Sequence, residues 1–95
     1  MDIFEGLSGF EWDGNNINKN WDKHWVSFYE CEEIFFNEPL VVSEDVVHSM
    51  HEKRYFVLGR TNAERHLFVV FTVRNKKIRV ISARDMNKKE RRFYK

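Results

Sequence analysis

The chain is poor in cysteine, proline and glycine, and it contains no long run of apolar residues. Its 95 residues include one cysteine, one proline and four glycines. A single thiol cannot form an intrachain disulfide, so a hydrophobic core must stabilise the fold. The low proline and glycine content excludes a collagen-like or low-complexity chain. No apolar run approaches the roughly 20 residues that a helix needs to cross a bilayer, so we expect no membrane association.

The first residues also lack the features of a secretory signal. The segment Met1-Asp2-Ile3-Phe4-Glu5 is acidic, whereas a signal peptide begins with basic residues followed by an apolar stretch. We therefore expect a cytoplasmic protein. Aromatic residues, in contrast, make up 16% of the chain, and each large ring can bury about 150–250 Å². This supply of apolar surface and the short length predict one domain over residues 1–95.

Charge is distributed unevenly along the chain, although the formal net charge is only +1. Residues 1–52 carry a net charge of −10, residues 53–73 a net charge of +3, and residues 74–95 a net charge of +8. A basic surface attracts polyanions, and this attraction weakens as salt is added. The alternative is that the acidic half folds back onto the basic half and neutralises it.

Two helices are predicted in the N-terminal half, after a short strand over residues 9–12 and a turn at residues 13–15. Over residues 15–25, Ile17, Trp21 and Trp25 recur every four residues, which indicates one apolar stripe on a helix. Ser27 and Glu30 have the Ser-x-x-Glu spacing of a capping box at the start of a second helix. Pro39 would end this helix. Its apolar face would contain Phe28, Cys31, Ile34 and Phe35.

Three β-rich runs follow at residues 54–59, 67–74 and 78–84, and short polar segments connect them. Such spacing predicts an antiparallel meander. Residues 41–42 can add a short strand, and we expect the acidic loop over residues 43–52 to be the most mobile part of the chain. Near the C-terminus, Asp85 or Asn87 can cap a helix that includes Tyr94. The fold class is therefore predicted to be α+β.

Alternation in the central run separates an apolar sheet face from a mixed one. The apolar face, which helices must cover, contains Leu67, Val69, Phe71 and Val73. The mixed face contains His66, Phe68, Val70, Thr72 and Arg74. In the last run the same alternation puts Arg79 and Arg84 on opposite faces, so one of these arginines would point toward the core.

Several kinds of chemistry find no support in the residues. His48 and His51 have the spacing of two metal ligands one helical turn apart, but two histidines in an acidic loop are more often solvated. Cys31 lies on a predicted apolar stripe, where a thiol needs an activating base to act as a nucleophile. The sequence has no glycine-rich phosphate loop, no paired-cysteine motif and no GxSxG motif. We therefore expect neither a metal ion nor another cofactor.

The remaining signal is a set of basic residues interleaved with aromatic ones in the C-terminal half. Arginine binds phosphate through paired hydrogen bonds and aromatic rings stack on unpaired bases, so the set is typical of a surface that binds single-stranded RNA. The alternative is a solvated basic surface without a ligand. The set contains Arg54, Arg65, Arg74, Lys76, Lys77, Arg79, Arg84, Lys88, Lys89, Arg91 and Arg92, with Tyr55, Phe93 and Tyr94. His24, near the end of the first predicted helix, is either a C-terminal cap or an acid–base group.

Five separated segments resemble the BrnT family of toxins, in order and spacing, over essentially the whole chain. They are Phe10-Glu11-Trp12-Asp13, Lys23-His24-x-Val26-Ser27-Phe28, Val69-Val70-Phe71-Thr72-x-Arg74, Ile78-Arg79-Val80-Ile81-Ser82-Ala83-Arg84 and Glu90-Arg91-Arg92-x-Tyr94. The chain departs from the family at Trp25, because the family usually has glycine after the Lys-His pair.

The resemblance implies the toxin of a bacterial type II toxin–antitoxin system. The implied fold is RelE-like, with a short N-terminal strand, two helices, an antiparallel meander of three to four strands and a C-terminal helix. The implied activity is cleavage of RNA, mRNA in particular, which inhibits translation and growth. A cognate antitoxin would neutralise the toxin and bind operator DNA, so the toxin would meet DNA only through that partner. A non-catalytic module of the same fold, which binds RNA or a partner, is the alternative.

With this family in view, we expect metal-independent cleavage in which the 2′-hydroxyl of RNA attacks the adjacent phosphate. Arg65, Arg74 and Arg84 would stabilise the charge on the phosphorane. His24 and Tyr94 would transfer protons. Other basic residues are expected to bind the RNA away from the phosphate that is attacked. They are Arg54, Lys76, Lys77, Arg79, Arg91 and Arg92.

Overall fold

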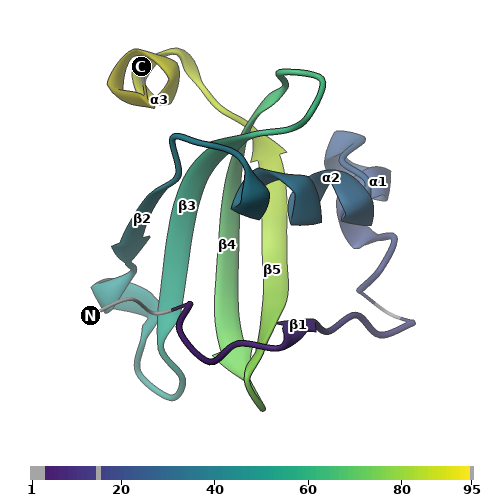
Figure 1. Ribbon diagram of the computed structural model, residues 1–95, viewed down its shortest axis with the longest axis vertical. Helices are drawn as coiled ribbons and strands as arrows, with labels where there is room; N and C mark the ends of the chain where they lie inside the picture. The colour runs from purple at the N-terminus through teal and green to yellow at the C-terminus, as the bar shows by residue number, and fades with distance from the viewer. Residues whose placement is uncertain (1–3, 15, 95) are drawn as a thin grey trace.

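The computed structural model describes residues 4–14 and 16–94, and it contains a five-stranded sheet with helices on its two sides (Figure 1). The elements are β1 (Gly9–Phe10), α1 (Lys19–His24), α2 (Phe28–Glu33), the 3₁₀ turn η1 (Ile34–Phe36), β2 (Val41–Glu44), the 3₁₀ turn η2 (Val46–His48), β3 (Arg54–Arg60), β4 (His66–Arg74), β5 (Lys77–Asp85) and α3 (Lys88–Tyr94). The predicted α+β class is confirmed.

The sheet has the order β1-β5-β4-β3-β2. Strands β2 to β5 pair antiparallel with their sequence neighbours, and β1 joins the outer edge of β5 in parallel. The three long strands begin and end within one residue of their predicted bounds, because polar connections interrupt a clear apolar pattern. β1 has only two residues, fewer than predicted. Ser43 and Glu44, predicted as part of an acidic loop, instead complete the edge strand β2, where polar side chains are tolerated.

The hydrophobic core lies between α2 and the predicted apolar face of the sheet (Figure 1). Leu67, Val69 and Phe71 of β4 are fully buried there, together with Cys31 and Ile34. The prediction of an apolar, helix-covered face is confirmed. The capping box that begins α2 is also confirmed, because the Ser27 hydroxyl accepts from the Glu30 N–H and the Glu30 carboxylate accepts from the Ser27 N–H.

The first helix differs most from its prediction. α1 has six residues, and the predicted start of the helix at Asn15 lies outside the described residues. The predicted apolar stripe is wrong, because Trp21 and Trp25 are 53% and 74% exposed. The helix ends at Trp25, whose backbone is left-handed, with φ 57° and ψ 36°. The buried residue of α1 is Asn20, so this short helix packs through polar contacts.

Polar side chains of α1 and of the turn before it form hydrogen bonds with backbone groups on the outer edge of β5, beyond the two residues that pair with β1. The buried Asn20 Oδ1 accepts a hydrogen bond from the Ala83 N–H at 3.0 Å. The Asn16 amide donates to the Val80 carbonyl at 2.8 Å, and Lys19 Nζ donates to the Ile81 carbonyl at 3.0 Å. An unpaired strand edge can otherwise recruit another chain, so α1 protects this edge.

A β-bulge in β5 changes which way its arginines point. Val70 pairs with Ser82 whereas Phe71 pairs with Val80, which leaves Ile81 as the extra residue. The side-chain alternation shifts by one at this position. Arg79, opposite Thr72, and Arg84, opposite Phe68, therefore lie on the same face of the sheet. The prediction that they lie on opposite faces is wrong, because strict alternation takes no account of a bulge.

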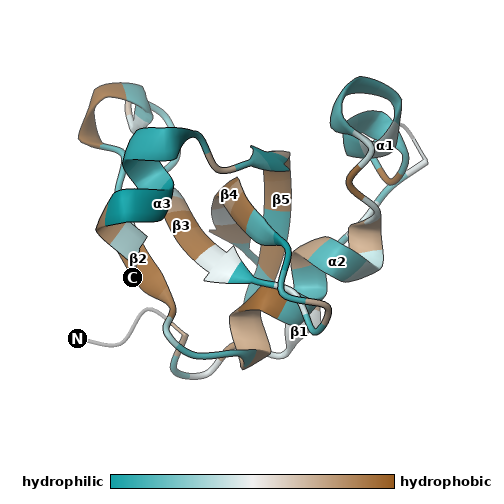
Figure 2. Cartoon of the chain, turned by 90° about the horizontal axis from the view of Figure 1, so that it is seen from above, coloured by the Kyte–Doolittle hydropathy of each residue, from teal (hydrophilic) through white to brown (hydrophobic). Residues whose placement is uncertain are grey.

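The C-terminal helix covers one end of the second sheet face. Tyr94 and Met86 are buried against Leu58 of β3. The helix begins with a reciprocal cap, in which the Asn87 side chain accepts from the Glu90 N–H and the Glu90 carboxylate accepts from the Asn87 N–H. Of the two predicted caps, Asn87 is the one used. Seen from above, α3 and α1 lie at opposite sides of the sheet, and α3 is coloured largely as hydrophilic (Figure 2).

Candidate functional site

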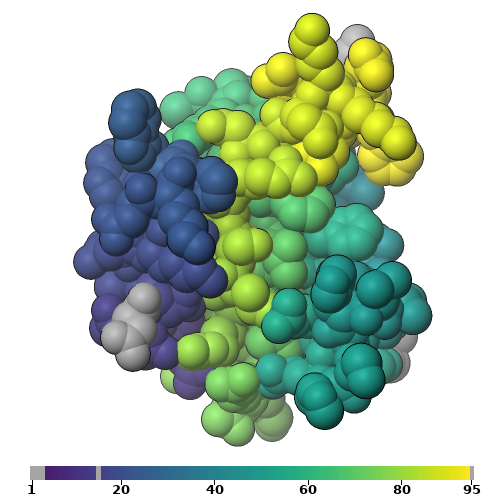
Figure 3. Space-filling model, turned by 180° about the vertical axis from the view of Figure 1, so that it is seen from behind, coloured from purple at the N-terminus to yellow at the C-terminus, as the bar shows by residue number. Residues whose placement is uncertain are grey.

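The second sheet face, which we call the open face, remains largely uncovered below α3. Figure 3 views this side, where the β4–β5 region is visible between α1 on one side and the β2–β3 segment on the other. Strand register places residues of β3, β4 and β5 side by side in three rows. The rows are Arg54, Thr72 and Arg79; Phe56, Val70 and Ser82; and Leu58, Phe68 and Arg84.

The centre of the open face is aromatic and its ends are basic. The rings of Phe56 and Phe68 are stacked with centroids 5.7 Å apart. The Arg84 guanidinium carbon lies 4.2 Å from the centroid of the Phe68 ring. A cation held over a ring can bind an anion while the ring beside it stacks on a base. This arrangement therefore has the chemistry needed to hold a nucleotide.

Arg84 is held in place by an acidic neighbour. Its two terminal nitrogens each donate to one oxygen of the Glu90 carboxylate at 2.9 Å, and one of them also donates to the Asp85 carbonyl at 3.0 Å. The hydrogen bond with Glu90 raises the pKa of Arg84. The Arg84 side chain is 36% exposed, so an incoming phosphate can reach it in competition with Glu90.

Arg74 and Arg79 are also paired with carboxylates from the acidic half of the chain. Arg74 contacts both oxygens of Glu52, at 3.2 and 3.0 Å, and this hydrogen bonding raises its pKa. Arg79 contacts Asp13 at 2.7 Å and Glu11 at 3.4 Å. The acidic half therefore neutralises part of the basic half, as one of the two charge interpretations predicted.

Arg65 lies at the junction of α1, α2 and the sheet, and its hydrogen bonds point inward. It donates to both carboxylate oxygens of Asp85, at 2.7 and 3.1 Å, and to the carboxylate of Glu30 at 3.3 Å. It also donates to the backbone carbonyls of Trp25 and His24, at 2.8 and 3.2 Å. The hydrogen bond with Asp85 is the main cause of its raised pKa. These contacts fix the turn between α1 and α2 against the sheet.

The other expected acid–base residues occupy different environments. His24 is exposed at the end of α1. Tyr94 is buried, its hydroxyl donates to the Pro39 carbonyl, and burial raises its pKa. The Tyr94 ring lies 5.4 Å from the ring of His66, which stands on the open face at the start of β4. Alternation had placed His66 on the mixed face, but no role had been assigned to it.

The expected site residues do not form a single cluster. Arg84 lies opposite Phe68, and Arg74 stands six residues further along β4. With a rise of about 3.4 Å per residue, these arginines are roughly 20 Å apart along the sheet. Arg65, Arg84 and Tyr94 lie near one end of the sheet and Arg74 near the other. The predicted meander already implies this separation, because Arg74 directly precedes the β4–β5 turn and Arg84 ends the last run.

The remaining expected RNA-binding residues frame the open face. Lys76 and Lys77 are exposed at the turn between β4 and β5, at the same end as Arg74. Arg91 and Arg92 are exposed on α3 at the other end. Elsewhere, His48 contacts the Asp45 carboxylate at 2.9 Å, and no group of three or more potential ligands for a metal ion occurs within residues 4–14 and 16–94.

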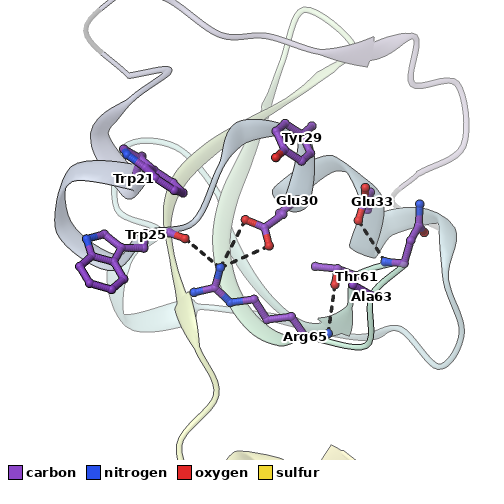
Figure 4. Close-up of a pocket in the computed structure, with 9 residues that line it drawn as sticks. Trp21, Trp25, Tyr29, Glu30, Glu33, Thr61, Ala63 and Arg65 are labelled. Carbon is purple, nitrogen blue, oxygen red and sulfur yellow. Dashed lines mark hydrogen bonds and ion pairs between the residues drawn. The ribbon is translucent and has the colours of Figure 1, made fainter.

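A separate hollow of about 600 Å³ lies at the corner between α1, α2 and the β3–β4 loop (Figure 4). It is lined by Trp21, Trp25, Tyr29, Glu30, Glu33, Thr61, Asn62, Ala63 and Arg65. The Trp25 carbonyl points at the Arg65 guanidinium, while its indole ring projects away from it (Figure 4). Sequence reasoning missed this hollow, because the spacing of the tryptophans indicated a buried stripe.

The fold and the open face together define a small α+β protein with an arginine-lined sheet surface. Residues 12–90 match the family described as ribonuclease toxin, BrnT, of type II toxin–antitoxin system. The chain belongs to this family, which confirms the resemblance found in the sequence. No curated protein matches the chain. Within the part of the chain that the structure describes, no helix has the length and apolar character required to cross a membrane.

Proposed function

We propose that this protein is a RelE-like endoribonuclease toxin that cleaves mRNA in the cytoplasm without a metal ion. The main support is that Arg54, Arg79 and Arg84 share the open face with the stacked pair Phe56 and Phe68. Arginine supplies fixed positive charge at any physiological pH, and aromatic rings bind bases without regard to sequence. Family membership supplies the link from such a surface to ribonuclease chemistry.

In the proposed reaction the 2′-oxygen of one nucleotide attacks the adjacent phosphorus, and the bond from phosphorus to the 5′-oxygen breaks. A base takes the 2′-hydroxyl proton, and an acid gives a proton to the departing 5′-oxygen. Arg65, Arg74 and Arg84 are alternative candidates for stabilising the phosphorane, because Arg74 and Arg84 lie too far apart to contact the same phosphate. His24 and Tyr94 are the candidates for moving the protons. The contacts favour Arg84, since it is accessible and lies beside an aromatic ring.

The RNA strand would run along the open face from the β4–β5 turn toward α3. Lys76 and Lys77 would hold phosphates at one end of this path, and Arg91 and Arg92 at the other. In the middle, a base would stack on Phe68 while its phosphate displaces Glu90 from Arg84. Each phosphate neutralised releases counterions, so RNA binding would weaken steeply with salt.

The first experiment is inducible expression in a bacterium, scored for growth and for new RNA 5′ ends. We expect arrest and new ends with the wild type, loss of both with Arg84→Gln, and fewer new ends with Arg74→Ala, because Arg74 lies at the far end of the proposed RNA path. Glu90→Gln is the matched variant, because it removes the charge that holds Arg84, and it should retain cleavage. Circular dichroism of the purified variants checks that each one folds. Normal growth with intact RNA from folded wild-type protein would contradict the proposal.

A non-catalytic RNA-binding module is the second candidate. It is favoured by the contacts of Arg65, Arg74, Arg84 and Tyr94, which are all engaged with other groups of the chain. Such a module would shift the mobility of RNA without producing new ends.

The proposed antitoxin would neutralise the toxin by laying an acidic segment across the open face and the exposed arginines of α3. Operator DNA would be bound by the antitoxin, and the toxin would reach DNA only through it. The complex would then lose affinity as salt rises, because the contact is between opposite charges.

A further inference from the structure

The hollow at the α1–α2 corner is lined by three large, exposed aromatic side chains. Trp21, Trp25 and Tyr29 are 53%, 74% and 57% exposed. Large apolar side chains that cluster on a surface mark an interaction site far more often than rings that are exposed singly. Tryptophan and tyrosine are also the residues that most often dominate the binding energy of protein interfaces.

The backbone at Trp25 provides a second, independent observation. Its φ of 57° lies in the left-handed region, which is unfavourable for a residue with a bulky side chain. In the free protein this strain is not offset by burial, because most of the indole is exposed. Strain of this kind is found at functional sites, and burial of the ring by a bound partner would offset it here.

The charge around the hollow selects the kind of partner. Glu30 and Glu33 line it directly, and Arg65 is the one cation among its described lining residues. The Arg65 guanidinium already donates to Glu30, Asp85 and two backbone carbonyls. A nucleic acid phosphate would therefore meet carboxylates and an occupied arginine. A protein segment with an apolar side chain next to lysine or arginine is complementary to both the rings and the carboxylates.

We propose that this hollow is a docking site for a segment of the antitoxin that inserts an apolar side chain between the rings and places a basic residue against Glu33. The inference rests on the proposed antitoxin partner. The antitoxin would then place a basic residue at the hollow in addition to the acidic segment expected on the open face. Trp25 and Tyr29 lie outside the open face, so this contact would add affinity to that of the acidic segment, and it would also cover Arg65, which lines the hollow.

The test compares Trp25→Gly and Trp21→Ala with the wild type in binding to purified antitoxin, expressed from the reading frame next to that of this chain. Trp25→Gly keeps the carbonyl that binds Arg65 and suits a left-handed φ, so the fold should be retained. Phe36→Ala is the matched control, since it removes a ring that is 78% exposed but lies outside the hollow. We expect a loss of affinity of at least tenfold for each tryptophan variant and less than twofold for the control.

Glu33→Gln should weaken the complex and reduce its dependence on salt, which tests the basic residue of the partner. Unchanged affinity in both tryptophan variants, or no binding by the wild type, would overturn the proposal. Two further measurements identify a different occupant. Loss of affinity for a labelled single-stranded RNA, with antitoxin binding intact, would assign the hollow to nucleic acid. A wild-type dimer in sedimentation that Trp25→Gly converts to a monomer would assign it to a second copy of the chain.

Failure of the proposed ribonuclease function gives a different result from failure of this inference. If the wild type binds antitoxin through the tryptophans but yields no new RNA ends, the docking site stands and the ribonuclease proposal fails. If RNA is cleaved and the tryptophan variants are neutralised as well as the wild type, the docking site fails and the ribonuclease proposal stands.

Discussion

At Trp25 a large side chain occupies a backbone conformation that costs most residues about 1–2 kcal/mol. The resemblance described in the sequence analysis implies glycine at this position, and a left-handed φ suits glycine because it has no Cβ to clash with the carbonyl. The residue at which the sequence departs from the implied pattern therefore has the unfavourable backbone conformation. The effect of Trp25 on the stability of the fold can be measured separately from its effect on binding of the proposed antitoxin.

We predict that Trp25→Gly leaves the free energy of unfolding unchanged or raises it by up to about 1 kcal/mol. Relief of the strain outweighs the greater freedom of glycine in the unfolded chain, and the exposed indole contributes little burial. Urea denaturation measures the change. Lys23→Gly, within the same helix, is the control and should lower stability by about 1 kcal/mol. Equal losses in the two variants would show that Trp25 is not strained.

Cys31 is an inert thiol by its environment. It is fully buried in α2, and burial, together with the nearby Glu30 and Glu32 carboxylates, raises its pKa to about 12. Only the thiolate is an effective nucleophile. We predict that iodoacetamide at pH 8 does not modify the native protein, whereas it alkylates Cys31 fully in denaturant. Mass spectrometry gives the extent of reaction, and rapid modification of native protein would contradict this environment.

The elements follow from the sequence to very different degrees. β3, β4 and β5 were predictable because alternation and polar connections are strong local signals. α2 was predictable from Ser27 and Glu30, which form its cap. α1 was not, because it packs through side-chain hydrogen bonds to β5 and leaves its tryptophans exposed. The bulge at Ile81 was also invisible, since one extra residue leaves no mark in an apolar strand.

The candidate site was only partly predictable, because its contacts join residues that are far apart in the sequence. Residue type and parity identified the arginines, but the partner of each one comes from elsewhere in the chain. Arg65 contacts Glu30 and Asp85, which are 35 and 20 residues away from it in sequence. Tyr94 reaches Pro39 across 55 residues. Such contacts depend on the assembled fold, and no local pattern encodes them.

We predict that Asn20→Ala lowers the free energy of unfolding by about 1–3 kcal/mol. The substitution leaves the buried Ala83 N–H without its acceptor, and an unsatisfied buried donor is costly. Lys19→Ala is the comparison, because it removes a hydrogen bond that is only partly buried and should cost less than about 1 kcal/mol. Urea denaturation of both variants measures the two changes in the free energy of unfolding. Equal small effects would mean that water replaces Asn20 at the strand edge.

At the scale of the whole molecule, ion pairs between arginines of the basic half and carboxylates from both halves make stability depend on pH. Hydrogen bonds with Arg65, Arg74 and Arg84 lower the pKa values of Asp85, Glu52 and Glu90, respectively. A carboxylate with a lowered folded-state pKa stabilises the fold above its unfolded pKa of about 4, and this contribution is lost as pH falls through the folded-state value.

We therefore predict that stability is nearly constant from pH 7 to about pH 5 and decreases as the pH falls below about 4. Urea denaturation at a series of pH values measures the effect. In Glu90→Gln, which cannot titrate at this position, the decrease between pH 4 and pH 2 should be smaller. A steeper decrease in that variant would contradict the assignment of the pH dependence to these pairs.

The uneven charge of the molecule also determines how the proposed antitoxin complex responds to salt. We predict that Arg91→Glu with Arg92→Glu weakens the complex and flattens its salt dependence, because these exposed arginines would contact the proposed acidic segment of the partner. Isothermal titration at two salt concentrations provides the measurement. Lys23, an exposed residue that lines neither the hollow nor the open face, is the control position, and Lys23→Gln should change the slope less than the double variant does. Unaltered affinity of the double variant would place the acidic segment elsewhere.

The parallel pairing of β1 with β5 has a consequence for how the chain folds. Gly9 pairs with Lys77, so this contact closes a loop of most of the chain, whereas the β3–β4 and β4–β5 hairpins close through short turns. The entropy cost of closure grows with loop length, and long-range pairing slows folding. The hairpins can therefore nucleate the sheet, and the N-terminal strand joins it last. A folding transition state built on residues 54–85, with Gly9 and Phe10 still unstructured, is the expected result.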